Sequence, residues 1–211
     1  MGNKYFRTAL LVVIMAATSG VVFSASNWTK EFTKNGISVY TRPIEGSSFK
    51  EFKGVGMIPA SMEACQKVLM DIPNLTRWMP DCISAKLLSS SNGGSSVITY
   101  NETKTPWPVS NRDVVSQSKV VVTNDRITHY ITAINRPDLA PLKSGNVRMT
   151  KMTAQWTLIR KGPKTLAIYQ VRADPGGSLP AWLANKSSRD LPLNTLIGLK
   201  RRAGLPQYQG N

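Results

Sequence analysis

Apolar and polar residues alternate with a period of two over several short segments, which is the spacing of half-buried β-strands. The clearest early case is 37–42, where Ile37, Val39 and Thr41 alternate with Ser38, Tyr40 and Arg42. The same kind of pattern predicts further strands at 49–58, 84–90, 96–103, 112–123, 126–135, 146–160 and 165–174. Short turn sequences, Asn124-Asp125 and 161–164, predict that the last four strands form two hairpins.

Two segments have helical spacing instead. After Pro59, Ser61 can cap a helix whose apolar stripe consists of Ala64, Cys65, Val68, Leu69 and Ile72. A last helix is predicted from Ser178 to about Arg202, with Pro192 expected to kink or split it. Strands that outnumber helices in this order predict an α+β domain, an antiparallel sheet curved around helices.

One face of the 146–160 strand becomes steadily more apolar and is expected to face inward: Arg148, Thr150, Met152, Ala154, Trp156 and Leu158. Arg148 on that face lies either at the rim or as a buried cation that needs a partner. Four tryptophans, Trp78, Trp107, Trp156 and Trp182, either line a cavity or fill a core. The loop 136–145 is long enough to be functional.

Composition narrows the possible chemistry. The 211 residues include 27 Lys and Arg, 12 Asp and Glu, two Cys and one His, so few routes lead to a metal site or a nucleophilic dyad. No Gly-x-Ser-x-Gly elbow, P-loop or dinucleotide-binding fingerprint is present. His129, between Ile127 and Ile131 on its strand, is interpreted as structural, and no cofactor is expected.

The N-terminus has the pattern of a secretory signal: Lys4 and Arg7, an apolar run, then small residues near Ser24 and Ser26. We therefore expect a signal peptide at 1–26, cleaved after Ser24 or Ser26, and a domain at 27–211. An uncleaved anchor is the alternative. Without Lys4 and Arg7 the formal charge falls from +15 to +13. Export to the periplasm or beyond would allow a disulfide between Cys65 and Cys82; two buried free thiols are the alternative.

A series of segments, in this order, resembles the bacterial exported branch of the START family, the steroidogenic-acute-regulatory-related lipid-transfer domains. The segments are Gly36-Ile37-Ser38-Val39-Tyr40-Thr41-Arg42, Phe49 to Gly54, Trp78-Met79-Pro80-Asp81-Cys82, Pro106 to Asp113, Gly145-Asn146-Val147-Arg148, and Asp174 to Asn185. The resemblance covers about 28–202. After the expected signal peptide only about ten residues precede the first predicted strand, which leaves little room for the long N-terminal helix of larger family members.

The resemblance implies a helix-grip fold, in which a curved sheet holds a long C-terminal helix over a lipid-sized tunnel. It also implies that the last helix acts as a lid and that a polar or charged group meets the polar end of a phospholipid or sterol-like ligand. Adjacent strand residues face opposite ways, so we expect Arg112 to point inward and Asp113 to pair elsewhere. The residues expected to contact lipid are Trp78, Met79, Trp107, Arg112, Val114, Arg148, Met152, Trp156, Trp182 and Leu183.

A non-enzymatic lipid carrier or sensor is the favoured function, and an enzyme acting on a hydrophobic ligand in the same cavity is the alternative. The positive charge also raises affinity for nucleic acid, but export and the lack of a recognition motif argue against that partner. The last helix is expected to dock on an anionic membrane through its basic residues, and the protein is expected to be a monomer. These residues are Lys186, Arg189, Lys200, Arg201 and Arg202.

Overall fold

The computed structural model describes residues 28–210, so the expected signal peptide lies outside the described residues. The strands are β1 (Thr29–Lys34), β2 (Ile37–Pro43), β3 (Lys50–Ile58), β4 (Cys82–Ser91), β5 (Ser96–Thr103), β6 (Asn111–Val122), β7 (Arg126–Ala133), β8 (Asn146–Arg148), β9 (Lys151–Lys161) and β10 (Lys164–Asp174). The helices are α1 (Met62–Met70), α2 (Ala181–Ala203), α3 (Pro206–Gln209) and the 3₁₀ segments η1 (Ile72–Arg77) and η2 (Asn92–Gly94).

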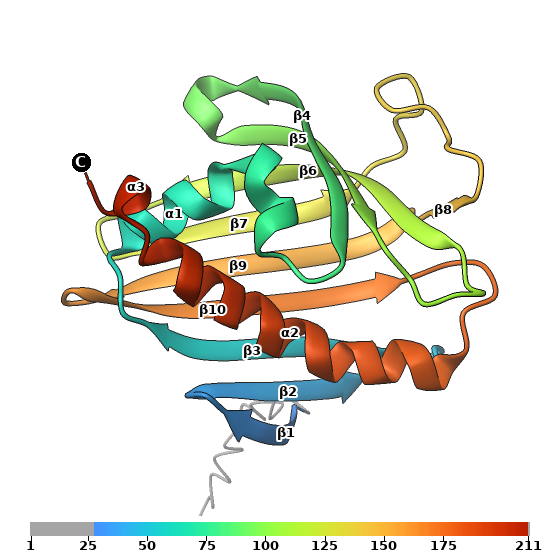
Figure 1. Ribbon diagram of the computed structural model, residues 1–211, viewed down its shortest axis with the longest axis horizontal. Coiled ribbons are helices and arrows are strands. Elements are labelled where there is room, and N and C mark those ends of the chain that lie inside the picture. Colours follow the sequence, from blue (N-terminus) through green and yellow to red (C-terminus); the bar gives the residue numbers. More distant parts are fainter. Residues whose placement is uncertain (1–27, 211) are drawn as a thin grey trace, which may run out of the picture.

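The described strands form one curved sheet in the order β1-β2-β3-β10-β9-β7-β6-β5-β4 (Figure 1). All neighbours along this path are antiparallel, and the predicted hairpins β6–β7 and β9–β10 are present. The long helix α2 runs diagonally across the sheet and packs mainly on β3 and β2 (Figure 1). This is the helix-grip arrangement, so the expected α+β fold is confirmed.

The apolar pattern did not predict strand β1, but the turn that follows β1 explains why the strand forms. β1 is mostly polar and lies at the edge of the sheet, where only Phe32 packs against the core. It joins β2 through Asn35 and Gly36, both with positive φ, the conformation that Asn-Gly favours in tight hairpins. A short edge strand therefore occupies the segment before Ile37.

The predicted strand 146–160 is wrong as one element, because the chain changes partners within it. β8 pairs in parallel with the first residues of β6, whereas β9 pairs with β7 and β10. The backbone N–H of Met149 donates to the carbonyl of Asp113 at 2.8 Å, where the two strands separate. Alternation of faces therefore does not continue from Arg148 to Met152.

Helix α1 begins as predicted: the Ser61 hydroxyl accepts from the N–H of Ala64 at 3.1 Å. Its apolar stripe is buried against α2 and the sheet. The last helix begins three residues later than predicted, after Pro180, without a side-chain cap, and it is continuous through Pro192. No helix within 28–210 is long and apolar enough to cross a membrane.

The C-terminal half of α2 is fixed by two close approaches. A Cβ on Gly198 would lie 2.3 Å from the carbonyl oxygen of Trp78, and a Cβ on Gly54 would lie 3.1 Å from Cβ of Pro192. Glycine is required at Gly198, whereas a side chain at Gly54 would push against Pro192 and Leu196. From Leu193 onward the helix also buries Leu196, Leu199 and Ala203, whereas among residues 182–191 only Ser188 is buried.

Candidate functional site

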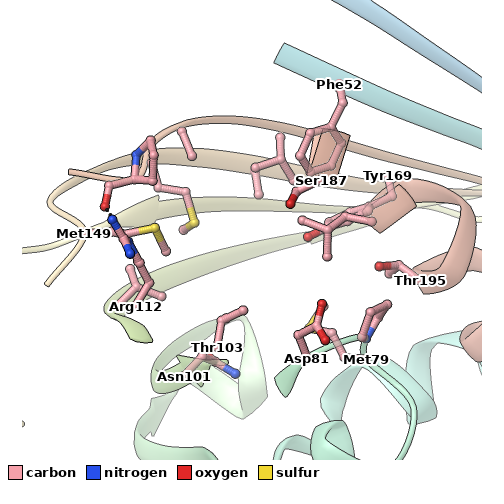
Figure 2. A pocket seen from close by; sticks show the side chains of 18 of the residues that line it. Phe52, Met79, Asp81, Asn101, Thr103, Arg112, Met149, Tyr169, Ser187 and Thr195 are labelled. Atoms are coloured by element: carbon pink, nitrogen blue, oxygen red, sulfur yellow. Dashed lines mark hydrogen bonds between the residues drawn. The ribbon is translucent and has the colours of Figure 1, made fainter. Parts of the chain in front are cut away.

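A cavity of about 680 Å³ lies between the concave face of the sheet, the α1–η1 segment and α2. That volume falls in the range of sites that enclose one small ligand. Figure 2 shows Arg112 and Met149 at one end, and Met79, Asp81 and Thr195 at the other. We call the end near Arg112 the mouth; Thr103 pairs with Arg112 across β5 and β6, and the exposed lining residues Lys104 and Pro106 follow it.

Most of the wall is apolar. Most of the apolar lining comes from β3, the α1–η1 segment and the residues just after it, β9, β10 and α2: Phe52, Leu69, Met70, Ile72, Leu75, Trp78, Met79, Met152, Ala154, Trp156, Val171, Ala173, Leu183 and Leu191. Val97, Val114 and Ile131 add apolar groups from β5, β6 and β7. Polar side chains gather on β5 and β6 and along α2: Thr99, Asn101, Thr103, Ser116, Ser118, Ser187, Asn194 and Thr195. The cavity therefore has an apolar side and a side that carries hydrogen-bonding groups.

The structure brings seven of the ten expected residues to this wall: Trp78, Met79, Arg112, Val114, Met152, Trp156 and Leu183. Trp107 and Trp182 do not line it, and they are 92% and 69% exposed. Trp107 follows Pro106 and Trp182 precedes Leu183, and both of these neighbours line the cavity. The two exposed indoles therefore lie just outside the mouth. A proline-flanked tryptophan in a loop gives no pattern from which its direction can be read.

Arg148 is also wrong as a cavity residue. It lies on β8, and its Nε donates to Oδ1 of Asp113 at 2.7 Å, with both side chains buried. The hydroxyl of Tyr100 donates to Oδ2 of the same carboxylate at 3.1 Å. Arg148 also donates to the carbonyls of Ala140 and Pro141, which ties the loop 134–145 to the outer face of the sheet.

A second ion pair holds the same loop. Nζ of Lys143 donates to both carboxylate oxygens of buried Glu102, at 2.9 and 3.0 Å. The Lys143 hydrogen bond lowers the pKa of Glu102. The long loop that the sequence offered as functional is therefore pinned to the convex side of β5 and β6, away from the cavity.

Arg112 points inward, and Asp113 pairs on the opposite face. The guanidinium is 4% exposed and donates to three backbone carbonyls: Ser110 at 2.6 Å, Gly176 at 2.9 Å and Pro175 at 3.3 Å. Burial lowers its pKa, but an arginine stays charged. None of the described carboxylates pairs with it. Arg112 thus holds the loop before α2 and places an uncompensated positive charge beside the mouth.

Sequence reasoning missed Tyr169 and took His129 as structural, yet both line the cavity. Tyr169 stacks on Trp156 with ring centroids 4.3 Å apart and contacts Phe52 edge-on at 6.1 Å. Nε2 of His129 lies 2.6 Å from Oε1 of Gln66 on α1. The alternation of β10 and β7 places both residues on the face shared with Trp156, which is the signal that could have found them.

The expected disulfide is wrong: Cys65 and Cys82 are both buried free thiols. Cys65 on α1 faces Thr165 of β10, whereas Cys82 faces Asn101 of β5, so the two side chains turn toward different strands. Burial raises the pKa of the Cys65 thiol to about 11. Both cysteines act as small apolar residues of the core.

A curved antiparallel sheet that holds a C-terminal helix over a cavity of this size defines the helix-grip class of ligand-binding proteins. The chain belongs to the START domain family, which matches residues 14–196.

Curated relatives include an uncharacterized protein of Pseudomonas aeruginosa, 34% identical, with 92% of this chain and 96% of that protein covered. Another is the phosphatidylcholine transfer protein of Mus musculus, 26% identical, with 89% and 86% covered.

Solved structures agree. A STAR-related lipid transfer protein from Xanthomonas axonopodis superposes with a TM-score of 0.78 at 35% identity, over 85% of this chain and 100% of that chain. Human StAR-related lipid transfer protein 5 superposes with a TM-score of 0.76 at 19% identity, over 86% and 88%. The second likeness concerns the fold alone.

Proposed function

We propose that the protein binds one lipid molecule in this cavity and carries or senses it without chemical conversion. The observation that carries the proposal is the 680 Å³ cavity, mostly apolar but with a buried, uncompensated Arg112 beside its mouth. Each buried methylene of a lipid contributes about 0.8 kcal/mol, so an apolar cavity can compete with a bilayer for the tail. The names of the lipid-transfer relatives support the same function.

Arg112 gives the ligand an orientation. Its guanidinium has five N–H donors, and three hydrogen bonds to carbonyls leave donors for a ligand oxygen. A phosphate or other oxygen-rich headgroup at the mouth would meet this charge, while the tail lies along Trp156 and Met152. A phospholipid fits this orientation; a sterol-like lipid has no charged headgroup for Arg112.

The lid is the N-terminal half of α2. Residues 181–191 cover the cavity, and the described polar contacts that hold them lie near the surface: Nδ2 of Asn185 to the carbonyl of Ser48 at 3.2 Å, and Arg189 to Glu31 at 3.5 Å. The C-terminal half is locked at Gly54 and Gly198. Pro192 lacks the N–H that would join the two halves, so it is the natural hinge.

The mouth is the surface that docks on a membrane. Exposed Trp107 and Trp182 adjoin the lining residues Pro106 and Leu183, and the exposed lysines of the lining, Lys50, Lys104 and Lys186, outnumber its exposed carboxylates, Asp81 and Asp190. Tryptophan favours the membrane interface, and each basic residue near an anionic surface contributes about 1 kcal/mol.

The basic residues at the far end of α2 fit docking less well. Lys200 lies about 27 Å along the helix from Trp182, because each residue rises 1.5 Å. Arg189 faces Phe32, and Arg202 packs over Tyr208.

One observation favours the enzyme alternative: Oγ of Ser118 lies 3.5 Å from Nδ1 of His129 in the cavity wall. Against it, the other ring nitrogen meets the amide of Gln66 instead of a carboxylate. A Ser–His hydrolase needs an orienting group that stabilises the charged imidazole.

Incubation with ester lipids separates the two functions. If the protein is a carrier, we expect one bound lipid per chain and no change in the lipid. Release of fatty acid that is lost in Ser118→Ala would instead show that the protein is an enzyme.

We further propose that the protein is exported and acts as a monomer that meets lipid and membrane, and not nucleic acid. The support is the basic and apolar pattern of the N-terminal residues and the mature charge of +13. N-terminal sequencing of protein from separated cell fractions tests export: a start near residue 25 or 27 is expected, and a cytoplasmic protein that retains Met1 would refute it.

A further inference from the structure

The hydrogen bond to Gln66 fixes the proton on His129. Oε1 of Gln66 can only accept, so Nε2 of His129, 2.6 Å away, carries the hydrogen. Burial lowers the pKa of His129 to about 4, so the ring is neutral at pH 7. In this tautomer Nδ1 has a lone pair and no proton, and it is a hydrogen-bond acceptor.

That acceptor is poorly satisfied by the protein. His129 is 4% exposed, and among the described residues Nδ1 meets only the Ser118 hydroxyl, at a long 3.5 Å. Ser118 lines the cavity beside it. Buried polar atoms almost always have a close partner, and one left without a partner destabilises the folded protein. The cavity is the place from which a partner can come.

A second incompletely satisfied group lies in the same row of the sheet. His129 is opposite Trp156 on β9, and Trp156 is opposite Tyr169 on β10. The phenol ring is held by the stack on Trp156, yet its hydroxyl has no hydrogen bond to any described residue. Burial raises the pKa of Tyr169, so the hydroxyl stays protonated and can donate.

These polar groups are remote from the headgroup end. Arg112 and Ser118 are six residues apart on β6, which is about 20 Å along an extended strand. The neighbouring lining positions of the sheet, Ile131 on β7 and Ala154 on β9, are apolar, and so are Leu69 and Ile72 of the α1–η1 segment. An unbranched hydrocarbon tail would leave the Nδ1 lone pair and the Tyr169 hydroxyl without partners.

Resting on the proposed function, we propose that Ser118, His129 and Tyr169 together form a hydroxyl-binding subsite, which selects lipids with an alcohol group on their buried part. The alcohol donates to Nδ1 of His129, and the Ser118 and Tyr169 hydroxyls complete its hydrogen bonds. The shared chemistry is a buried alcohol, which a sterol-type ring or a hydroxylated acyl chain can supply.

Matched lipid pairs test this selection. Purified full-length protein is offered 12-hydroxystearate with stearate, and separately cholesterol with 5-cholestene, which lacks the hydroxyl, and bound lipid is quantified by native mass spectrometry. We expect a preference of about tenfold for the alcohol in at least one pair, and the pair that shows it identifies the source. His129→Phe and Ser118→Ala should reduce the preference to within about twofold, while Tyr130→Phe, a control on the outer face of β7, should not.

Equal binding of alcohol and parent lipid by the wild type would overturn the subsite and leave the carrier function standing. Failure to bind any of the four lipids or phosphatidylcholine would instead refute the carrier function.

A second variant tests the same contact and keeps the imidazole ring of His129 in place. Gln66→Glu would hold His129 as an imidazolium, which turns Nδ1 from an acceptor into a donor. The preference for 12-hydroxystearate over 12-oxostearate should then fall about tenfold, because a ketone accepts but cannot donate. An unchanged ratio would show that Nδ1 does not contact the ligand.

Discussion

Nε of Arg148 lies 2.7 Å from Oδ1 of Asp113, on the face of β6 opposite to the cavity. Loss of one partner leaves the other charge buried, which costs about 3–5 kcal/mol. We therefore expect Arg148→Met to lower the free energy of unfolding by that amount in urea titrations, with the preference among bound lipids unchanged. Arg136→Met, whose ion pair with Asp138 is 47% and 59% exposed on its two sides, is the control and should leave the free energy of unfolding nearly unchanged. A change in lipid preference in Arg148→Met would show that Arg148 contacts the bound lipid.

Arg112 differs from Arg148, because its partners are carbonyls and its charge faces the lipid. Arg112→Leu should weaken binding of lipids with an anionic headgroup at least tenfold and also lower stability by about 3 kcal/mol, since buried carbonyls lose their donors. Arg112→Lys keeps the charge and should restore part of the headgroup preference but little of the stability. If Arg112→Leu alters stability alone, Arg112 is purely structural.

The buried histidine predicts a loss of stability in mild acid. The pKa of His129 is about 4 in the folded chain, below its ordinary value of 6.5. As the pH falls below 6.5 the unfolded chain takes up the proton first, so stability is full above pH 6.5 and declines down to pH 4. The loss is about 3 kcal/mol. In urea titrations across this range, His129→Phe should lack that component of the decline, and parallel curves for the two proteins would contradict the buried neutral state.

The docking surface predicts a salt-dependent role for the two exposed tryptophans. Trp107→Ala with Trp182→Ala should weaken vesicle binding about tenfold or more, and transfer of lipid between vesicles should slow with it. High salt or vesicles without anionic lipid should have a similar effect on the wild type. Tyr130→Ser, which removes an aromatic ring that is 51% exposed on β7, is the control. Transfer that ignores both tryptophans and salt would exclude docking through the mouth.

The strands and the helix α1 could be predicted because their signals are local. Alternation gave the face of β9 that carries Met152 and Trp156, and Ser61 marked the start of α1. The direction of Trp107 and Trp182 could not be predicted, because a loop or an uncapped helix start has no period. Arg148 was misplaced because the strand break at Met149 depends on which partner strand is near, a tertiary property.

The interior subsite shows the same limit. His129 read as structural because its neighbours Ile127 and Ile131 are apolar, and the sequence does not show that Gln66, 63 residues away, would fix its tautomer. The alternation of β10 places Tyr169 on the cavity face, but its role follows only from its position beside Trp156. The faces of continuous strands were predictable, whereas strand breaks and partners across the sheet were not.

The most direct measurement of the central claim is native mass spectrometry of the protein as purified from its host, followed by lipid extraction. If the cavity holds one lipid, we expect a species heavier than the chain by the mass of one lipid. This lipid should exchange when phosphatidylcholine or a hydroxylated lipid is added. A protein that is empty, and that stays empty after incubation with phospholipid, sterol and fatty acid, would contradict it.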